Sequence, residues 1–183
     1  MNIEIEKNEM IKKTAYILIG DDKTGKTTFQ KYLILHLCGI DKFTKLNTNL
    51  VHSIIHPESP RKLKTLFTIN RSIQEKVGDY KTIDNYFDKF FKDADICILS
   101  SHSHGNSIDD IRRMIERLNE KFYNVESVFF TNHLNSNTQE ISKLNWQSRN
   151  LIENPINNKE WEKQIELGAK FFGDLIIRYS KLN

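Results

Sequence analysis

One run of eight residues limits the folds open to this chain more than any other feature. Residues 20–27 read Gly-Asp-Asp-Lys-Thr-Gly-Lys-Thr, in which two glycines separated by four residues precede Lys and Thr. An apolar stretch at 16–19 reads as a buried strand before this run, and an apolar helix over 26–37 follows it. A strand, a glycine loop and a helix in this order surround an anion with backbone N–H groups and the helix N-terminus. The sequence therefore predicts a phosphate-binding loop that holds a nucleoside phosphate.

The residue types in this loop suit that role. Gly25 lets the backbone approach phosphate oxygens closely. Lys26 offers a positive charge to the terminal phosphates, and the Thr27 hydroxyl offers a ligand to Mg²⁺. The residues expected to contact the nucleotide are Gly20, Asp21, Asp22, Lys23, Thr24, Gly25, Lys26, Thr27 and Thr28.

Composition excludes several classes of protein. The length of 183 residues predicts one domain over 1–183, and 27 basic against 24 acidic residues leave a net charge too small to indicate nucleic-acid binding. Cys38 and Cys97 lie in apolar runs, so we expect unpaired core residues in a reducing compartment. Because no signal peptide, membrane span or lipid-anchor motif is recognisable, we expect a cytoplasmic protein without a membrane anchor of its own.

Hydrophobic periodicity predicts strands alternating with helices. Strand-like runs at 46–56 and 62–70 flank a turn at 57–60 and predict an antiparallel hairpin. Further apolar runs predict helices near 83–91, 108–118 and 161–179 and strands near 95–99, 125–131 and 150–152. The last helix is expected to bury a stripe that runs from Trp161 to Tyr179. This order predicts a three-layer α/β fold, with a mostly parallel sheet, one antiparallel edge strand and helices on both faces.

Four segments beyond the loop follow the motif order of one known family. Residues 66–76 read LFTINRSIQEK, residues 90–95 FFKDAD, residues 130–135 FTNHLN and residues 151–157 LIENPIN. In order, these resemble the DTAGQER strand segment, the YYRGAD-type segment, the guanine-reading GNKxD motif and the ETSAK motif of Ras-superfamily small GTPases (Rab/Ras/Arf-like). Glu153 is the one residue that matches the last of these.

The resemblance implies a Ras-like P-loop NTPase domain that binds GTP or GDP with Mg²⁺ and acts through a protein effector. The family's site residues fall on Gln74 for catalysis, on Asn132, His133 and Asn135 for the base, and on Thr27 and Thr44 for Mg²⁺.

Several positions depart from the family pattern, and each departure weakens one function. Asn135 replaces the carboxylate that reads guanine, and an amide with one acceptor oxygen cannot satisfy both guanine donors. Asn70 replaces an Asp linked to Mg²⁺, and Ile73 replaces the glycine that senses the γ-phosphate. Asp22 brings a carboxylate to the loop, and its negative charge repels the γ-phosphate. We therefore expect weak or absent hydrolysis, with guanine, xanthine and adenine all open as the base.

Two other functions remain open at this stage. A small P-loop phosphotransferase or ATPase would use the same loop, although residues 98–101 lack the carboxylate that such an enzyme carries at its strand end. A structural pseudo-GTPase would keep the fold only as a scaffold for a partner. His102 and His104 form a polar loop suited to contacting a partner or nucleotide, whereas zinc would require two more ligands there.

Overall fold

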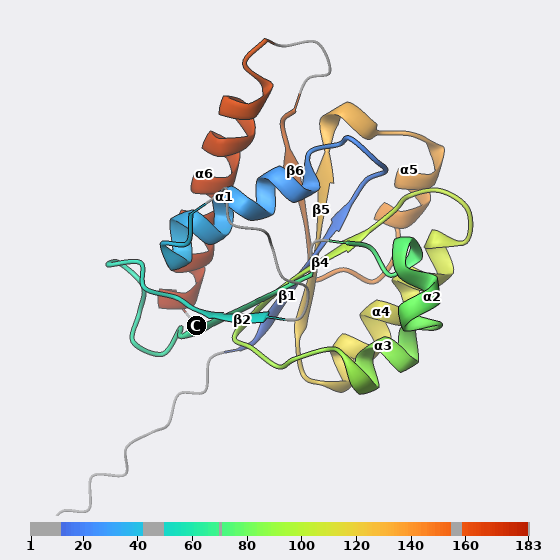
Figure 1. The fold of residues 1–183 in the computed structure, drawn as a ribbon, viewed down its shortest axis with the longest axis horizontal. Coiled ribbons are helices and arrows are strands. Elements are labelled where there is room, and N and C mark those ends of the chain that lie inside the picture. Colours follow the sequence, from blue (N-terminus) through green and yellow to red (C-terminus); the bar gives the residue numbers. More distant parts are fainter. Residues whose placement is uncertain (1–11, 42–49, 70, 155–158, 183) are drawn as a thin grey trace, which may run out of the picture.

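A single six-stranded sheet forms the centre of the structure (Figure 1). The structure, a computed structural model, describes residues 12–41, 50–69, 71–154 and 159–182. The strands are β1 (Thr14–Ile19), β2 (Leu50–Ser53), β3 (Thr65–Thr68), β4 (Ile96–Ser101), β5 (Asn124–Phe130) and β6 (Ser148–Ile152). Their order across the sheet is β2-β3-β4-β1-β5-β6, and within the described residues β2 and β3 form its one antiparallel pair. The expectation of a mostly parallel sheet with an antiparallel edge strand is confirmed.

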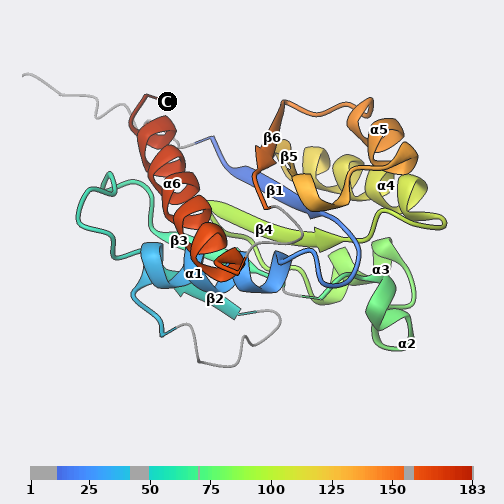
Figure 2. The same cartoon turned by 90° about the horizontal axis from the view of Figure 1, so that it is seen from above.

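The helices cover both faces of this sheet, as Figure 2 shows from above. They are α1 (Lys26–Cys38), α2 (Val77–Tyr80), α3 (Ile83–Lys89), α4 (Ser107–Glu120), α5 (Ser136–Ser142) and α6 (Trp161–Leu182). Helices α1 and α6 pack on one face, whereas α3, α4 and α5 pack on the other. Among the described helices, none is long and apolar enough to cross a membrane.

The central strand β1 is buried on both faces, which explains its uninterrupted apolar sequence. Ile17 contributes to the core under α3 and α4, and its neighbour Leu18 contributes to the core under α1 and α6. Cys38 and Cys97 lie in these two cores on opposite faces and are unpaired, as expected. Burial raises the pKa of each thiol to about 12, so both behave as small apolar residues.

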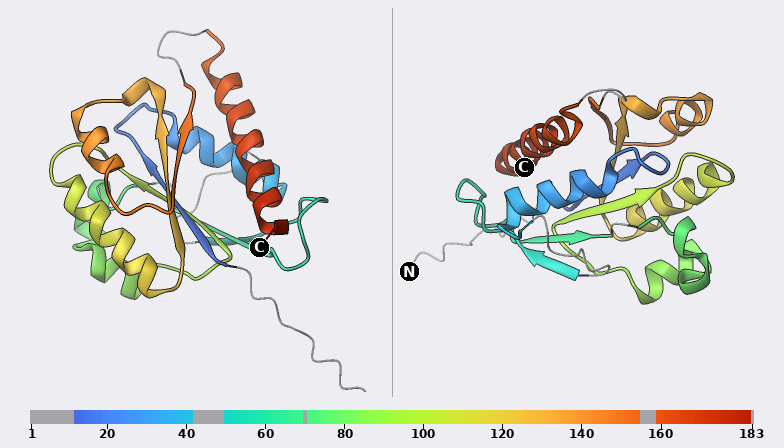
Figure 3. Two further views of the ribbon diagram at one scale, coloured as in Figure 1. Left: turned by 180° about the vertical axis from the view of Figure 1, so that it is seen from behind. Right: turned by 45° about the horizontal axis from the view of Figure 1, so that its top comes forward.

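Helix α6 packs beside α1 on one face of the sheet (Figure 3). Aromatic contacts with β1 and α1 and one hydrogen bond hold it there. The Phe172 ring lies 4.9 Å from the Tyr16 ring and 5.6 Å from the Phe29 ring, measured between centroids. Near its N-terminus, Glu162 accepts a hydrogen bond of 2.8 Å from the Tyr32 hydroxyl. These contacts set where the first turn of α6 lies relative to the glycine loop.

Two features of the fold differ from the sequence expectations. The short helices α2 and α5 were not expected, because a segment such as 136–142 has too few apolar residues to show a helical period. Trp161 and Tyr179 were expected in the core, but they are 46% and 55% exposed. Because α6 has 22 residues and α1 has 13, the ends of α6 extend beyond the helix against which it packs.

Two glycines of α6 provide a matched test of this packing. A Cβ at Gly173 would lie 2.6 Å from His36 Cδ2 and 3.3 Å from Leu33 Cδ1, whereas at Gly168 it would meet only Ile152 Cγ2, at 3.5 Å. Gly168→Ala is expected to raise the free energy of unfolding by about 0.5–1 kcal/mol, since alanine favours helix. Gly173→Ala is expected to lower it by about 1–3 kcal/mol through overpacking. Urea unfolding followed by circular dichroism measures both, and an equal gain in the two variants would contradict the packing described.

Candidate functional site

A cavity of about 740 Å³ opens beside the glycine loop, at the edge of the sheet where the parallel strands end. Its lining consists of Asp21, Asp22, Lys23, Thr24, Gly25, Lys26, Thr27, Thr28, Glu75, Asn132, His133, Asn154 and Trp161. The loop residues predicted from the sequence, with the exception of Gly20, therefore line one cavity, together with two of the three residues predicted to contact the base. Gln74 and Asn135 are not among the described residues that line it.

The backbone of the loop takes a form suited to enclosing an anion. Gly25 has a φ of 98°, and a Cβ there would lie 2.5 Å from Ile165 Cδ1, so both conformation and space require glycine. The Thr24 hydroxyl donates to the Asp21 carbonyl at 2.8 Å and closes the loop on itself. Within the described residues no side chain caps the N-terminus of α1, and its first turn holds no acidic residue. The N–H groups of that turn are therefore available to an anion.

Lys26 is folded back into the loop. Its ammonium donates to the Gly20 carbonyl and, at 2.9 Å, to the Asp21 carbonyl, and the residue is only 7% exposed. Burial lowers the pKa of Lys26, while the negative charges of Glu75, Asp21 and Asp22 act in the opposite direction. A phosphate would offer this ammonium charged oxygens in place of two neutral carbonyls.

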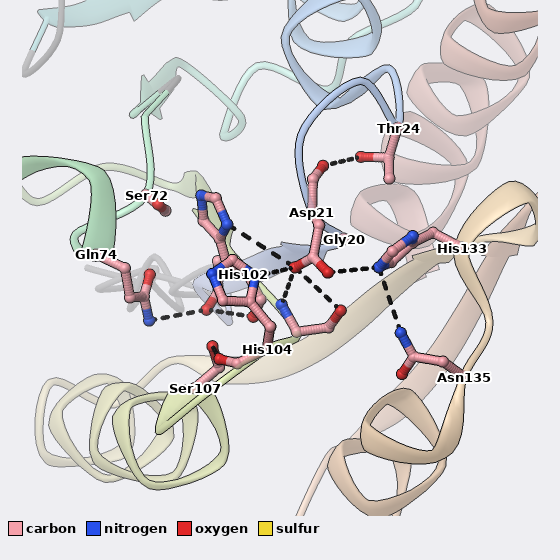
Figure 4. A network of polar contacts seen from close by, with 12 residues as sticks. Gly20, Asp21, Thr24, Ser72, Gln74, His102, His104, Ser107, His133 and Asn135 are labelled. Carbon is pink, nitrogen blue, oxygen red and sulfur yellow. Dashed lines mark hydrogen bonds and ion pairs between the residues drawn. The ribbon is translucent and has the colours of Figure 1, made fainter.

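The Asp21 carboxylate binds the glycine loop to two neighbouring loops (Figure 4). Oδ1 accepts hydrogen bonds from the Ser103 N–H at 2.8 Å, the Ser103 hydroxyl at 3.2 Å and His104 Nδ1 at 2.7 Å, and Oδ2 accepts one from His133 Nε2 at 2.6 Å. Burial by itself would raise the pKa of Asp21, but these hydrogen bonds outweigh it and hold that pKa well below its usual range. Asp21 therefore fixes the loop to the ends of β4 and β5.

His102 lies between two carboxylates at the end of β4. Its Nε2 is 2.9 Å from Glu75 Oε1, and its Nδ1 lies 3.8 Å from Asp21 Oδ1 without a hydrogen-bond partner among the described residues. Burial would raise the pKa of Glu75, but hydrogen bonds from His102 and Ser72 lower it. Asp21, His102 and His104 have ligand atoms within 4.8 Å of one another, so the fold adds a third potential metal ligand to the two histidines seen in the sequence.

Two asparagine side chains, at the ends of β5 and β6, donate hydrogen bonds to the glycine loop. The Asn132 amide donates to the Thr24 carbonyl at 3.3 Å, and the Asn154 amide donates to the same carbonyl at 2.7 Å. Asn132 was expected to contact the base, whereas Asn154 was not expected at the site. The sequence signal for Asn154 was a polar residue two positions after the strand expected at 150–152.

The other two residues predicted to contact the base are engaged within the protein. His133 donates to Asp21, as described above. Asn135 is the N-cap of α5, where its Oδ1 accepts from the Thr138 N–H at 3.0 Å and its own N–H donates to the Thr138 hydroxyl at 2.7 Å. The carbonyl oxygen that would accept from a base is therefore used to begin a helix.

Gln74 is hydrogen-bonded to the end of β4 and to α4 and is not among the described residues that line the cavity. Its amide donates to the Ser101 hydroxyl at 3.2 Å and to Asp110 Oδ2 at 3.0 Å. Strand β4 lies between β1 and β3, so the loop after β4 is the direct neighbour of the glycine loop on that side. Ile73, which replaces the phosphate-sensing glycine, is buried in the core at 5% exposure.

Oxygen donors suited to Mg²⁺ are present on two sides of the cavity. Thr27 is exposed in the first turn of α1, and Glu75 lines the same cavity and acts electrostatically on Lys26. Thr44 and Asn70 lie outside the described residues. A hydroxyl and a carboxylate are the hard ligands that Mg²⁺ prefers, so the donor set fits this ion. Sequence reasoning missed Glu75, although it directly follows Gln74.

Comparison with known proteins adds no family to this description. The chain matches no model of a protein family, and no curated protein is significantly similar to it in sequence. Its function must be argued from the fold and the site.

The Asp21 network predicts a pH-dependent contribution to stability. Because the native pKa of Asp21 is depressed, its contribution is present above the unfolded pKa of about 3.9 and is lost as the pH falls. Asp21→Asn is expected to lower the free energy of unfolding by about 1–3 kcal/mol at pH 7, and the difference from wild type should narrow below about pH 4. Urea unfolding of both proteins at pH 7 and pH 3 measures this difference in the free energy of unfolding.

Asp22→Asn is the matched control for that experiment. Asp22 is exposed, so its replacement is expected to change stability by less than about 0.5 kcal/mol at either pH. An effect of Asp21→Asn that stays the same at both pH values would contradict the role given to the ionised carboxylate.

Proposed function

We propose that this protein binds a nucleoside triphosphate with Mg²⁺ through residues 20–28, hydrolyses it slowly or not at all, and acts through a protein partner as a small GTPase-like regulator. One observation carries the proposal: the uncapped N-terminus of α1, Lys26 and Thr27 all lie at one cavity of about 740 Å³. Cavities of this size fall within the usual range for small-molecule ligands, roughly 300–1,000 Å³.

Phosphate binding would use groups that the protein now satisfies only in part. The N–H groups of the first turn of α1 would donate to phosphate oxygens, and Lys26 would exchange its two carbonyl acceptors for charged ones. Gly25 permits the close approach of the backbone. Thr27 and Glu75 would hold Mg²⁺, which neutralises phosphate charge when it is bound.

Two features of the site support slow turnover. Asp22 is exposed and places a carboxylate at the cavity where the γ-phosphate charge would lie. Gln74 is held by Ser101 and Asp110, away from a position that could orient an attacking water. Catalysis of phosphoryl transfer depends on positioning and on favourable charge, and these residues provide neither.

The Ras-like character of the fold is also a proposal. Its structural support is a mostly parallel sheet with one antiparallel edge strand and helices on both faces, which is compatible with P-loop folds in general. However, β4 separates β1 from β3, so a change caused by nucleotide would reach the surface through Ser103, His104 and His133. A partner that senses the bound state would then contact the loops after β4 and β5.

Lys26→Ala tests the binding proposal. Titration calorimetry with Mg²⁺ and GTP, ATP or XTP is expected to show binding to the wild type and affinity about 10- to 100-fold lower in the variant, because a charge-assisted hydrogen bond is lost. Lys143→Ala replaces an exposed lysine at the C-cap of α5, outside the cavity; this variant is the control and should bind as the wild type does. A wild-type protein that binds no nucleotide would overturn the proposal and leave the scaffold alternative.

Turnover provides an independent measurement. At saturating Mg²⁺ and nucleoside triphosphate, the wild type is expected to hydrolyse with a rate constant below about 0.01 s⁻¹. Asp22→Ala is expected to tighten triphosphate binding by roughly fivefold, and diphosphate binding less, since one repulsive charge is removed. Chromatographic separation of the nucleotides measures the rate, and rapid phosphate release by the wild type would refute the slow-turnover proposal.

A further inference from the structure

We infer that Trp161 provides the nucleobase subsite of this cavity and that the base is held by stacking on the indole, with little discrimination among purines. This inference rests on the proposed function, because it concerns the part of a nucleotide beyond its phosphates. It identifies a residue that the sequence pattern had placed in the core.

Trp161 is an aromatic side chain at the boundary of the cavity and solvent. It lines the cavity and is 46% exposed, whereas the other tryptophan, Trp146, is 6% exposed in the core under α4. A large apolar ring that stays half exposed beside a polar loop has unused surface on which a planar ligand can stack. Base stacking on an aromatic side chain tolerates any base, because every base has a π-face.

The position of Trp161 is set by the packing of the first turns of α6. Ile165 lies one turn further along the same helix face, and it packs so closely on Gly25 that no Cβ would fit there. The hydrogen bond between Glu162 and Tyr32 holds the same turn against α1. Trp161 therefore lies about one helical turn, roughly 5 Å, beyond the contact between α6 and the glycine loop.

The polar residues expected to read the base are committed elsewhere. His133 is bound to Asp21, and the carbonyl of Asn135 caps α5. Asn132 and Asn154 both donate to the Thr24 carbonyl. Reading a base edge through His133 or the Asn135 carbonyl would cost an internal hydrogen bond, whereas stacking on Trp161 costs none. The phosphates would be held by the loop while the base adds affinity without specificity.

The test compares nucleotides with a ligand that has no base. Titration calorimetry is done with Mg²⁺ and ATP, GTP, XTP or tripolyphosphate on the wild type and on Trp161→Ala. The three nucleotides are expected to bind the wild type within about tenfold of one another. Trp161→Ala is expected to weaken all three by about tenfold and to leave tripolyphosphate unchanged.

Two further variants and a spectroscopic measurement support the interpretation. Phe171→Ala removes a 65% exposed aromatic side chain of the same helix, away from the cavity lining, and should change nothing. Trp161→Phe keeps an aromatic ring and should bind nucleotides within about threefold of the wild type. Nucleotide is expected to quench the tryptophan fluorescence of the wild type but not that of Trp161→Phe, and tripolyphosphate is expected to quench neither.

The outcomes separate this inference from the proposed function. If neither nucleotide nor tripolyphosphate binds the wild type, both fail. If nucleotides bind but Trp161→Ala binds them as tightly as the wild type, without quenching by nucleotide in the wild type, the stacking subsite is wrong and the proposed function stands. A preference above about 100-fold for one base would likewise overturn the inference, because stacking alone cannot produce it.

Discussion

The parallel pairing of β1 with β4 on one side and β5 on the other is the constraint on which the site depends. Parallel strands end at the same edge of a sheet, so the loops after all three strands meet there. The glycine loop follows β1, the loop with His102 and His104 follows β4, and Asn132 and His133 follow β5. Any change that shifted this pairing would separate the groups that hold the loop.

The loop satisfies much of its own polarity in this structure. Asp21 accepts four hydrogen bonds from two neighbouring loops, and Lys26 donates to two carbonyls of its own loop. A ligand must therefore exchange existing hydrogen bonds and cannot simply fill empty positions, which reduces the net gain on binding. The uncapped N–H groups of α1 are the exception, and they point to an anion as the ligand.

Several elements could be predicted because their signals are local. The strand over 14–19, the helix that begins at Lys26 and the hairpin around residues 57–60 all depend on short runs of apolar and turn residues. Helix α5 could not be predicted from its period, because it begins with a cap at Asn135 and buries only Thr138 and Ile141. The exposure of Trp161 could not be predicted either, since it depends on where the end of α6 extends beyond α1.

The sequence by itself determined the glycine loop between a strand and a helix, the α/β alternation and the residues on either side of Lys26, because these depend on neighbours along the chain. Tertiary structure alone decided which distant groups surround that loop. It placed β4 beside β1, turned Gln74 toward Asp110, joined Asp21 to His133, and brought Trp161 to the cavity. The physical reason is that strand order and helix packing minimise exposed apolar surface over the whole chain, and no local pattern encodes the result.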